Sequence, residues 1–427
     1  MTGEALFPGP HFSRVNGDLH LGGVKLSDLA EKYGTPLYVY DFDRIRSRAR
    51  HLAKELHAVN ERSRAFFAVK ALSNLSALKA LHSEGLGMDV VSGGEIERCL
   101  ATGINARDIV FSGVAKSRDE ISLGVRVGIG CFNIESPHEV DLLIASLGQA
   151  GKKARVALRI NPDVDGKTHE KINTGLAETK FGLNPTLAMT VARKILQHPC
   201  LILSGVSSHI GSQIFDLQTF RDAGHEVREF AKNLLELGAP IDHIDMGGGL
   251  GVAHRPGELD NAPTFKAWVD AVKTSLPNRD TALHLEPGRS IVADSGVLLT
   301  RVIEVKSGDS KKFALVDAGM TELLRPALYD AYHRIEHVAR ETTDNDQRYD
   351  VVGPVCETSC WLGEDEPLPG LSSGDVLAIL TSGAYGMTMA SNYNTRAKPA
   401  ELAIEQSSVR LIRKQETLSS LWELERF

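Results

Sequence analysis

Residues 205–251 read GVSSHIGSQIFDLQTFRDAGHEVREFAKNLLELGAPIDHIDMGGGLG and show one complete unit of the pattern that predicts the fold. It begins with a strand pattern over Gly205–His209, continues into a helical pattern that ends at glycine, and returns to a strand pattern over His243–Met246. A strand–helix–strand unit of this kind is typical of a parallel sheet whose strands are joined by helices. The same alternation runs from about residue 65 to about residue 290.

Eight short β-branched or apolar runs within that region are strand candidates, and helical segments such as residues 135–151 separate them. The candidates are Ala65–Val69, Gly87–Val91, Ile109–Ser112, Cys131–Ile134, Val156–Ile160, Gly205–His209, His243–Met246 and Ala282–Glu286. Eight such units in a span of this length predict a (β/α)8 TIM barrel.

The rest of the chain has a different pattern. Residues 300–319, 348–356 and 374–386 read as short alternating strands separated by Gly, Pro, Asp and Ser, which predicts an antiparallel β domain. The strand TPLYVYD at residues 35–41 precedes the barrel and is expected to join that domain. We therefore expect two domains, a barrel over residues 45–295 and a β domain made of residues 1–44 and 296–427.

Composition points to a globular enzyme that acts on a small molecule. Of the 427 residues 42% are hydrophobic and 24% are charged, and the net charge of −7 argues against nucleic-acid binding, which needs a basic face. No apolar run is long enough to cross a membrane and no signal-peptide pattern is present, so we expect a cytoplasmic protein. The five cysteines are scattered without metal-ligand spacing, which predicts reduced thiols and no metal site.

Lys70 ends the first barrel strand, in RAFFAVK. Active sites of TIM barrels lie at the carboxyl ends of the strands. A lysine at the mouth of an apolar barrel is a candidate Schiff-base amine, because desolvation lowers its pKa. The alternative is a solvated lysine at a strand end, and the residue alone does not exclude it.

Two further strand ends carry candidate binding groups. Gly247, Gly248 and Gly249 follow strand seven and expose backbone N–H groups that a phosphate could approach, although a tight turn would use the same residues. Strand eight ends in the turn Glu286–Arg289, where the carboxylate could hold a protonated ring nitrogen and the arginine a substrate carboxylate. An ion pair that closes the turn is the alternative.

Other candidates are weaker individually. His209 is either a hydrogen-bonded strand-end histidine or a ring that stacks on a flat cofactor, and Ser212 either caps a helix or donates to phosphate. In the second domain Arg325 and Tyr329 are spaced to share a helix face, as a substrate patch or a surface cation–π pair. The same domain contributes Cys356, Glu357 and Tyr385, and a free cysteine is most often an inert apolar side chain.

Seven motifs, in chain order, resemble the fold-type III pyridoxal-phosphate decarboxylases: FFAVKA, SHIGSQ, GGGLG, EPGRS, RPALYD, GPVCET and GAYG. Three further stretches are most similar to the diaminopimelate decarboxylase branch of that family: DVVSGGE at 89–95, residues 161–182, and MASNYNTRAKPAE at 389–401. The resemblance covers about residue 23 to about residue 405.

This resemblance implies a role for each candidate. Lys70 would hold pyridoxal 5′-phosphate as a Schiff base, His209 would stack on its ring, and Glu286 would contact its ring nitrogen. Cys356 would return a proton to Cα after CO₂ leaves. The remaining cofactor contacts implied are Ser212, Gly247, Gly248, Gly249, Pro287, Gly288, Arg289 and Tyr385, and the substrate contacts are Arg289, Arg325, Tyr329, Glu357 and Tyr385.

The resemblance also implies a reaction and an assembly. The reaction is decarboxylation of meso-2,6-diaminopimelate to L-lysine, and the assembly is a homodimer in which Cys356 and Glu357 enter the partner's active site. The sequence departs from the family at Leu72, where asparagine is common, and at Cys360 and Trp361, where Asp-Phe is usual.

Three other functions share parts of this pattern. A decarboxylase for ornithine or arginine is disfavoured because Arg289 and Arg325 suit a distal carboxylate and would repel a distal cation. An alanine-racemase-like activity would need a tyrosine in place of Cys356, and a non-catalytic cofactor carrier would lack the second domain.

Overall fold

The structure is a computed structural model that describes residues 4–6, 9–165, 180–339 and 346–426. Most of the motif at 161–182 lies outside the described residues. The chain forms two compact units, one made of residues 46–252 and 262–290 and the other of residues 1–45, 253–261 and 291–427. We call them the barrel unit and the β unit.

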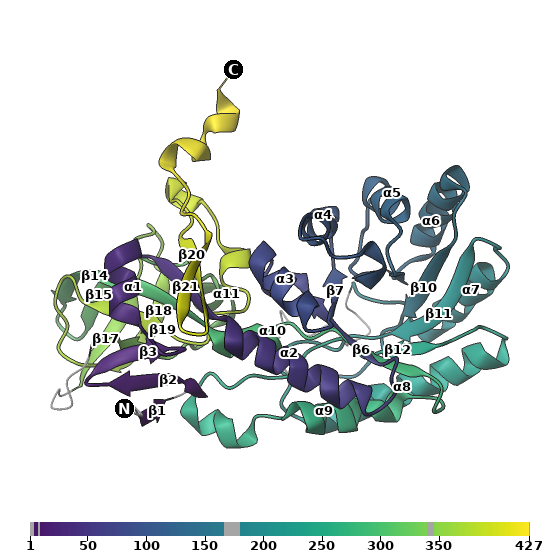
Figure 1. Cartoon of the computed structure of the whole chain (residues 1–427), viewed down its shortest axis with the longest axis horizontal. Helices are drawn as coiled ribbons and strands as arrows, with labels where there is room; N and C mark the ends of the chain where they lie inside the picture. The colour runs from purple at the N-terminus through teal and green to yellow at the C-terminus, as the bar shows by residue number, and fades with distance from the viewer. Residues whose placement is uncertain (1–3, 7–8, 166–179, 340–345, 427) are drawn as a thin grey trace. The chain divides into compact units, whose positions relative to one another are not determined.

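The barrel unit contains eight parallel strands that close in the order β10-β11-β12-β13-β6-β7-β8-β9. All eight strands predicted from the sequence are present, and the TIM barrel is confirmed (Figure 1). Their bounds are β6 Arg64–Ala68, β7 Gly87–Val90, β8 Ile109–Phe111, β9 Cys131–Ile134, β10 Ala154–Arg159, β11 Leu201–Ser207, β12 His243–Asp245 and β13 Ala282–Leu285.

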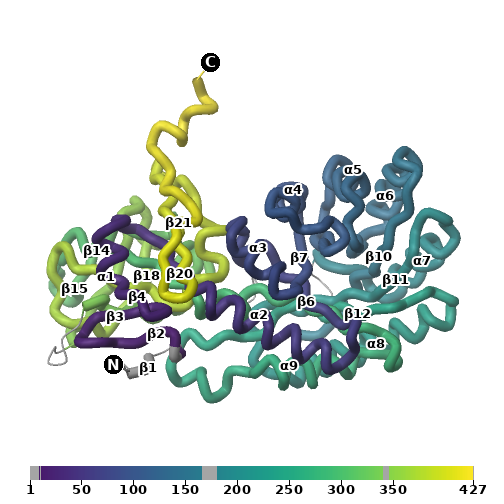
Figure 2. The backbone as a smooth tube through the Cα atoms, in the orientation of Figure 1, coloured from purple at the N-terminus to yellow at the C-terminus, as the bar shows by residue number. Residues whose placement is uncertain are grey.

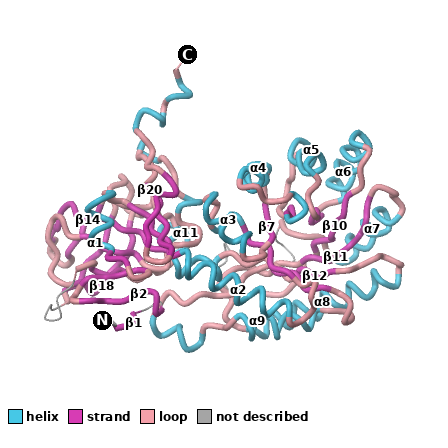
Figure 3. The backbone as a smooth tube through the Cα atoms, viewed as in Figure 1, coloured by secondary structure: helices cyan, strands magenta, loops and turns pink. Residues whose placement is uncertain are grey.

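Helices connect successive strands and lie outside the barrel (Figure 3). Their bounds are α2 Phe42–His57, α3 Leu75–Ser83, α4 Gly93–Ala101, α5 Arg118–Val127, α6 Pro137–Ala150, α7 Pro185–Leu196, α8 Leu217–Glu236 and α9 Phe265–Val272. From α3 onward each begins after a polar residue whose side chain accepts a backbone N–H of the first turn; Ser117 forms a full capping box with Glu120. These caps fix where each helix starts and hence how long each strand-to-helix loop is.

Apolar side chains fill part of the barrel. Phe66, Val110, Cys131 and Ala157 come from four different strands and pack in one buried cluster. Because the interior is packed, chemistry is expected in the loops at the carboxyl ends of the strands.

The β unit contains a nine-stranded sheet whose main path is β18-β17-β15-β14-β5-β20-β21, with β19 also on β14 and β16 on β19. In Figure 2 this unit combines purple segments from the start of the chain with green and yellow segments from its C-terminal part. The bounds are β5 Leu37–Asp41, β14 Gly296–Ser307, β15 Lys312–Val316, β16 Ile335–His337, β17 Gln347–Val352, β18 Trp361–Leu368, β19 Val376–Ile379, β20 Ala400–Glu405 and β21 Ser408–Arg413. The predicted strand TPLYVYD is β5, and it pairs with β14 and β20. A smaller sheet of β1 Glu4–Leu6, β2 Gly9–Val15, β3 Asp18–Leu21 and β4 Val24–Lys25 precedes α1 Leu26–Tyr33.

The large sheet is mixed, whereas the sequence pattern suggested antiparallel pairing alone. The pairs β15·β17 and β20·β5 are parallel, and the others on the main path are antiparallel. Two strands joined by a tight hairpin must be antiparallel, whereas strands joined by a long connection can pair in either direction. Both parallel pairs join strands that are far apart along the chain, so hairpin-like spacing could not reveal their direction.

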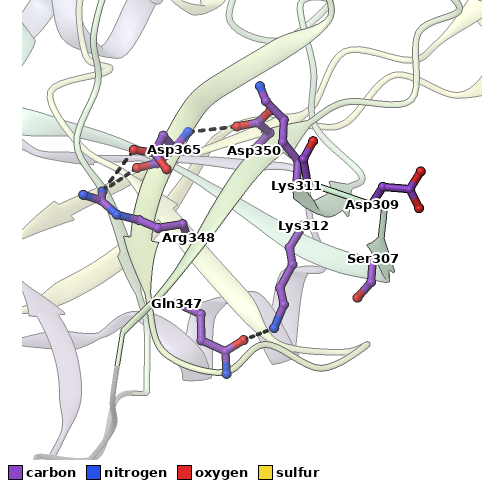
Figure 4. Close-up of a pocket in the computed structure, with 10 residues that line it drawn as sticks. Ser307, Asp309, Lys311, Lys312, Gln347, Arg348, Asp350 and Asp365 are labelled. Atoms are coloured by element: carbon purple, nitrogen blue, oxygen red, sulfur yellow. Dashed lines mark hydrogen bonds and ion pairs between the residues drawn. The ribbon is translucent and has the colours of Figure 1, made fainter.

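One surface pocket of the β unit, with a volume of about 640 Å³, lies beside the turn between β14 and β15 (Figure 4). Two of its lysines are held by neighbouring side chains: Lys311 donates to Asp350 at 2.7 Å, and Lys312 donates to the neutral Gln347 at 2.6 Å. None of the predicted site residues lines this pocket.

Candidate active site

Lys70 lies just past the carboxyl end of β6, in a 3-10 turn over Val69–Ala71. Its Nζ donates a hydrogen bond to Oδ2 of Asp89 on the neighbouring strand β7, 2.9 Å away. Asp89 has no exposed surface, whereas 39% of the Lys70 side chain is exposed. The buried carboxylate therefore orients the amine at the mouth of the barrel and leaves it accessible to a small molecule.

The three glycines after β12 allow backbone segments to approach closely. A Cβ on Gly247 would lie 2.6 Å from Nδ1 of His209, and a Cβ on Gly248 would overlap the carbonyl oxygen of Glu286. Gly247 and Gly249 also have φ of 66° and 102°, which glycine adopts without strain. The glycines therefore let this loop pack closely against His209 and Glu286. The N–H groups of Gly247 and Gly248 are not exposed as the sequence suggested, because that of Gly247 donates to Oδ1 of Asp245 at 2.8 Å and that of Gly248 donates to His209.

The His209 ring, two residues after β11, is fixed against this loop. Its Nδ1 accepts a hydrogen bond from the N–H of Gly248 at 3.1 Å. Burial of the ring, and then the positive charges of Arg159 and Lys70, lower the pKa of His209 well below its usual range. The ring is therefore neutral at physiological pH, a charge state that suits stacking on a planar cofactor.

Glu286 follows β13 and is buried among other acidic groups. Its Oε1 accepts hydrogen bonds from Ser112 at 3.1 Å and from Asn133 at 3.3 Å. Burial, and then the charges of Asp245 and Asp89, raise the pKa of Glu286 well above its usual range. Burial likewise raises the pKa of Asp245 to about 6. A cation placed beside Glu286 would be stabilised by these acids.

The turn Glu286–Arg289 is attached to the strand that precedes Lys70. The N–H of Ala68 donates to the carbonyl of Pro287 at 3.0 Å. Arg289 begins the short helix α10 (Arg289–Val292) and is buried, and its Nε and Nη2 donate to Oγ of Ser212 at 3.3 and 3.1 Å. The barrel unit thus brings together, on one rim, the candidates from strands one, six, seven and eight.

Cys356 and Glu357 lie in the loop between β17 and β18 of the β unit, and both are exposed. The Cys356 thiol donates to Oδ1 of Asn394 at 3.4 Å. The Tyr393 hydroxyl donates to Oε1 of Glu357 at 2.6 Å. Two residues of the 389–401 motif therefore hold the thiol and the carboxylate, which explains why that motif accompanies GPVCET.

Arg325 and Tyr329 lie one helical turn apart on α11 (Arg325–Tyr329). Arg325 is buried, and its Nε donates to Nε2 of His333 at 3.2 Å. Tyr385, also in the β unit, has a φ of 56°. A non-glycine residue in this strained conformation is a frequent feature of ligand-binding sites.

Comparison with known proteins identifies the family. The family model "Pyridoxal-dependent decarboxylase, pyridoxal binding domain" matches residues 42–293. The diaminopimelate decarboxylase of Vibrio cholerae is 45% identical over 417 residues, which cover 96% of this chain and 97% of the relative. The enzyme of that name from Zymomonas mobilis is 42% identical over 413 residues, again covering 96% and 97%. The chain belongs to the diaminopimelate decarboxylase family.

Solved structures of the diaminopimelate decarboxylase family have the same fold. The Helicobacter pylori enzyme complexed with L-lysine is 41% identical, with a TM-score of 0.89 over 94% of this chain and 99% of that chain. The M. jannaschii enzyme in co-complex with L-lysine is 35% identical, with a TM-score of 0.91 over 97% of this chain and 98% of that chain.

Pyridoxal phosphate, the cofactor of the matched domain, fits the rim of the barrel unit. The amine of Lys70 is accessible, and Ser212 and Arg289 lie together with side chains that can donate to a phosphate. Burial and the charges of Asp245 and Asp89 raise the pKa of Glu286, so a positively charged ring nitrogen beside it would be stabilised. These are the groups that an aldehyde, a phosphate and a ring nitrogen need.

Several residues of the rim were missed by the sequence reasoning. Asp89 holds Lys70, Asp245 acts on Glu286, and Asn133 donates to Glu286. Arg159, at the end of β10, forms a buried 2.7 Å ion pair with Glu135. Asp89, Asn133 and Arg159 lie in strands two, four and five, whose ends were not read for polar side chains, whereas Asp245 lies in strand seven, just before the glycines that drew attention there.

The departures from the family pattern have local explanations. Leu72 is buried at the end of the 3-10 turn that carries Lys70. Cys360 is buried against Gly319 and Gly353, where its Sγ accepts the N–H of Met320 at 3.4 Å. Cys360 therefore packs the base of the loop that carries Cys356, and Trp361 begins β18.

Two features are missing from the part of the chain that the structure describes. It contains no group of three or more His, Cys, Asp or Glu side chains arranged to hold a metal ion. Among the same residues, no helix has the length and apolar character needed to cross a membrane.

Proposed function

We propose that this chain is a pyridoxal-phosphate-dependent decarboxylase that converts meso-2,6-diaminopimelate to L-lysine and CO₂. The observation that carries the proposal is the rim where Lys70, the glycine loop and Glu286 meet, in a chain whose full-length relatives are diaminopimelate decarboxylases. Two solved relatives are described as complexes with L-lysine, the product of the proposed reaction.

The barrel unit would bind the cofactor through Lys70, with His209 against the ring and Glu286 at the ring nitrogen. When bound, pyridoxal phosphate supplies an electron sink for the bond that breaks. We assign the other cofactor contacts to Ser212, Gly247, Gly248, Gly249, Pro287, Gly288, Arg289 and Tyr385. The contact between Arg289 and Ser212 supports this set, because both side chains can donate to a phosphate.

Glu286 would keep the ring nitrogen protonated. Its pKa is raised by burial and by two nearby acids, so a positively charged partner is favoured at that position. Hydrogen bonds from Ser112 and Asn133 fix its Oε1. Glu286 would therefore keep a proton on the ring nitrogen, and a protonated ring accepts electrons more readily than a neutral one. Because the site is buried, this proton would not depend on solvent.

The distal end of the substrate would contact the β unit. We propose that Arg325 and Arg289 bind its carboxylate, assisted by Tyr329 and Tyr385, and that Glu357 binds its ammonium group. Buried arginine suits a carboxylate and repels an amine or a guanidinium. This argues for diaminopimelate over ornithine or arginine as the substrate.

Cys356 would return a proton to Cα after CO₂ leaves. We propose that it acts, with Glu357, in the active site of a partner subunit, so that the enzyme is a homodimer with shared sites. Residues 45–295 would form the cofactor domain, and residues 1–44 with 296–427 the domain that supplies substrate and partner contacts. All five cysteines are free thiols, which supports the cytoplasm as the location.

The proposal is tested by incubating the holoenzyme with diaminopimelate, lysine, ornithine and arginine and measuring CO₂ release. Diaminopimelate should be the best substrate, and L-lysine should accumulate in proportion to CO₂. Faster decarboxylation of ornithine or arginine would contradict the assignment.

A further inference from the structure

A buried histidine lies behind the arginine that we assign to the substrate. Arg325 begins α11, and its Nε donates to Nε2 of His333 at 3.2 Å. The guanidinium is planar, so a hydrogen bond from Nε also fixes the positions of Nη1 and Nη2. These two terminal nitrogens are the ones that bind a carboxylate end-on through two hydrogen bonds. The direction of the guanidinium therefore depends on where His333 lies.

The other side of the His333 ring is attached to the sheet. Its Nδ1 is 3.0 Å from the carbonyl oxygen of Leu380. A carbonyl can only accept, so Nδ1 carries the hydrogen and Nε2 presents a lone pair. This tautomer is the one in which both hydrogen bonds form, and Nε2 is then an acceptor for Arg325.

The backbone around His333 is also held. The N–H of Leu380 donates to the carbonyl of Arg334 at 2.9 Å, which extends the ladder between β16 and β19 by one position. His333 has no exposed surface, and the His254 ring packs edge-on against it with centroids 4.9 Å apart. The ring cannot turn without breaking these contacts.

We propose that His333 is a positioning residue that aims the Arg325 guanidinium at the distal carboxylate of the substrate. The inference rests on the proposed function, in which Arg325 binds that carboxylate. His333 acts through Arg325 and touches no reacting atom. A histidine that merely filled the core would affect stability and would not act through this arginine.

Two substitutions of His333 each preserve one of the two hydrogen bonds that its ring forms. The amide oxygen of glutamine in His333→Gln reaches the place of Nε2 and can accept from Arg325. The shorter amide of asparagine in His333→Asn reaches the place of Nδ1, so it can donate to Leu380 but cannot serve Arg325. The matched pair therefore differs in the contact that the proposal requires.

The experiment measures kcat and KM for meso-2,6-diaminopimelate with the holoenzymes of the parent, His333→Gln, His333→Asn, Arg325→Ala and the double variant His333→Asn/Arg325→Ala. We expect His333→Asn to raise KM about tenfold while kcat changes less than about threefold, and His333→Gln to stay within about threefold of the parent. The double variant should match Arg325→Ala, because the histidine acts through the arginine.

Three results would overturn the inference. They are a parental KM in His333→Asn, a KM in His333→Gln as high as that of Arg325→Ala, and an added loss when His333→Asn is combined with Arg325→Ala. If His333→Asn does not fold, the KM of His333→Gln decides alone. If Arg325→Ala leaves KM unchanged, the proposed role of Arg325 in substrate binding is wrong. If Arg325→Ala raises KM but the His333 variants do not behave as expected, only the inference about His333 is wrong.

Discussion

The Nζ atom of Lys70 lies 2.9 Å from Oδ2 of Asp89, and the two residues are 19 positions apart in the chain. The contact exists because Ala68 and Asp89 are paired in the parallel ladder of β6 and β7, so the turn after β6 returns the lysine over its neighbour. A fully buried carboxylate thus sets the direction of an amine whose side chain is 39% exposed.

Replacement of Lys70 with alanine should abolish turnover and the visible absorbance of bound cofactor that borohydride bleaches, because the amine that would hold the cofactor as a Schiff base is removed. Absorbance spectra and CO₂ release provide the measurements. Lys194→Ala is the control. Lys194 lies on the outer helix α7 and forms an exposed ion pair with Asp141 of α6. Parental activity in Lys70→Ala would remove Lys70 from the mechanism.

Arg325→Ala should lower kcat/KM for diaminopimelate by roughly tenfold to over a hundredfold, which corresponds to about 1.5–3 kcal/mol for loss of a charged bidentate contact. Steady-state kinetics measures the ratio. Arg348→Ala is the control, because Arg348 is an exposed arginine of the same unit (Figure 4). An unchanged ratio, or a better rate with lysine or ornithine in the parent, contradicts a distal-carboxylate site.

Mixing inactive Lys70→Ala with inactive Cys356→Ala should restore activity if active sites are shared across a two-fold dimer. Each hybrid dimer then has one site with both defects and one with neither. Random exchange of equal amounts makes about half of the dimers hybrids, so activity should reach roughly a quarter of the parental value. Continued inactivity despite demonstrated exchange, or an active monomer in sedimentation, argues for sites within one chain.

Gly248→Ala should lower the free energy of unfolding by about 1–3 kcal/mol and weaken retention of pyridoxal phosphate, because the added Cβ overlaps the rigid carbonyl of Glu286. Thermal unfolding and cofactor release are the measurements. Gly148→Ala in α6 is the matched control: nothing lies within 4 Å of its added Cβ, and alanine should stabilise the helix by about 0.5–1 kcal/mol. Equal behaviour of the two variants would contradict the close approach.

The stability of the barrel unit should fall as the pH rises from about 7 to above 9. Burial opposes the charge of His243, but its hydrogen bonds to Asp242 and Cys131 raise its pKa to about 9. A raised pKa in the folded state contributes stability below the ordinary value near 6.5, and this contribution is lost as the pH passes 9. In Asp242→Asn much of this pH dependence should disappear, at a cost of about 1–2 kcal/mol at pH 7. Chemical denaturation between pH 6 and 10 tests it; identical profiles would contradict it.

The barrel could be predicted from the sequence because its strands are short apolar runs at regular spacing, and their neighbours in space are mostly their neighbours in sequence. Lys70, the glycine loop and the Glu286 turn could be found because each follows a predicted strand. These residues are recognisable from local sequence alone.

The partners of these residues could not be predicted. Asp89 heads the motif DVVSGGE, but its contact with Lys70 depends on the register of β6 with β7, which no local pattern encodes. The raised pKa of Glu286 arises only when Asp245 and Asp89 come from other strands to the same rim. The parallel direction of β20 beside β5 depends on pairing across more than 350 residues, and the tautomer of His333 depends on Leu380.

The central place of β5 in its sheet sets an order for folding. Strand β5 comes from residues 37–41, yet its two neighbours are β14, which begins at residue 296, and β20, which begins at residue 400. During synthesis the ribosome must release nearly the whole chain before this strand finds both neighbours, while most strand pairs of the barrel are available earlier. The five residues of β5 are all buried in the native sheet, so during synthesis their apolar side chains stay uncovered for longer than those of the barrel strands and are open to chaperone binding or aggregation.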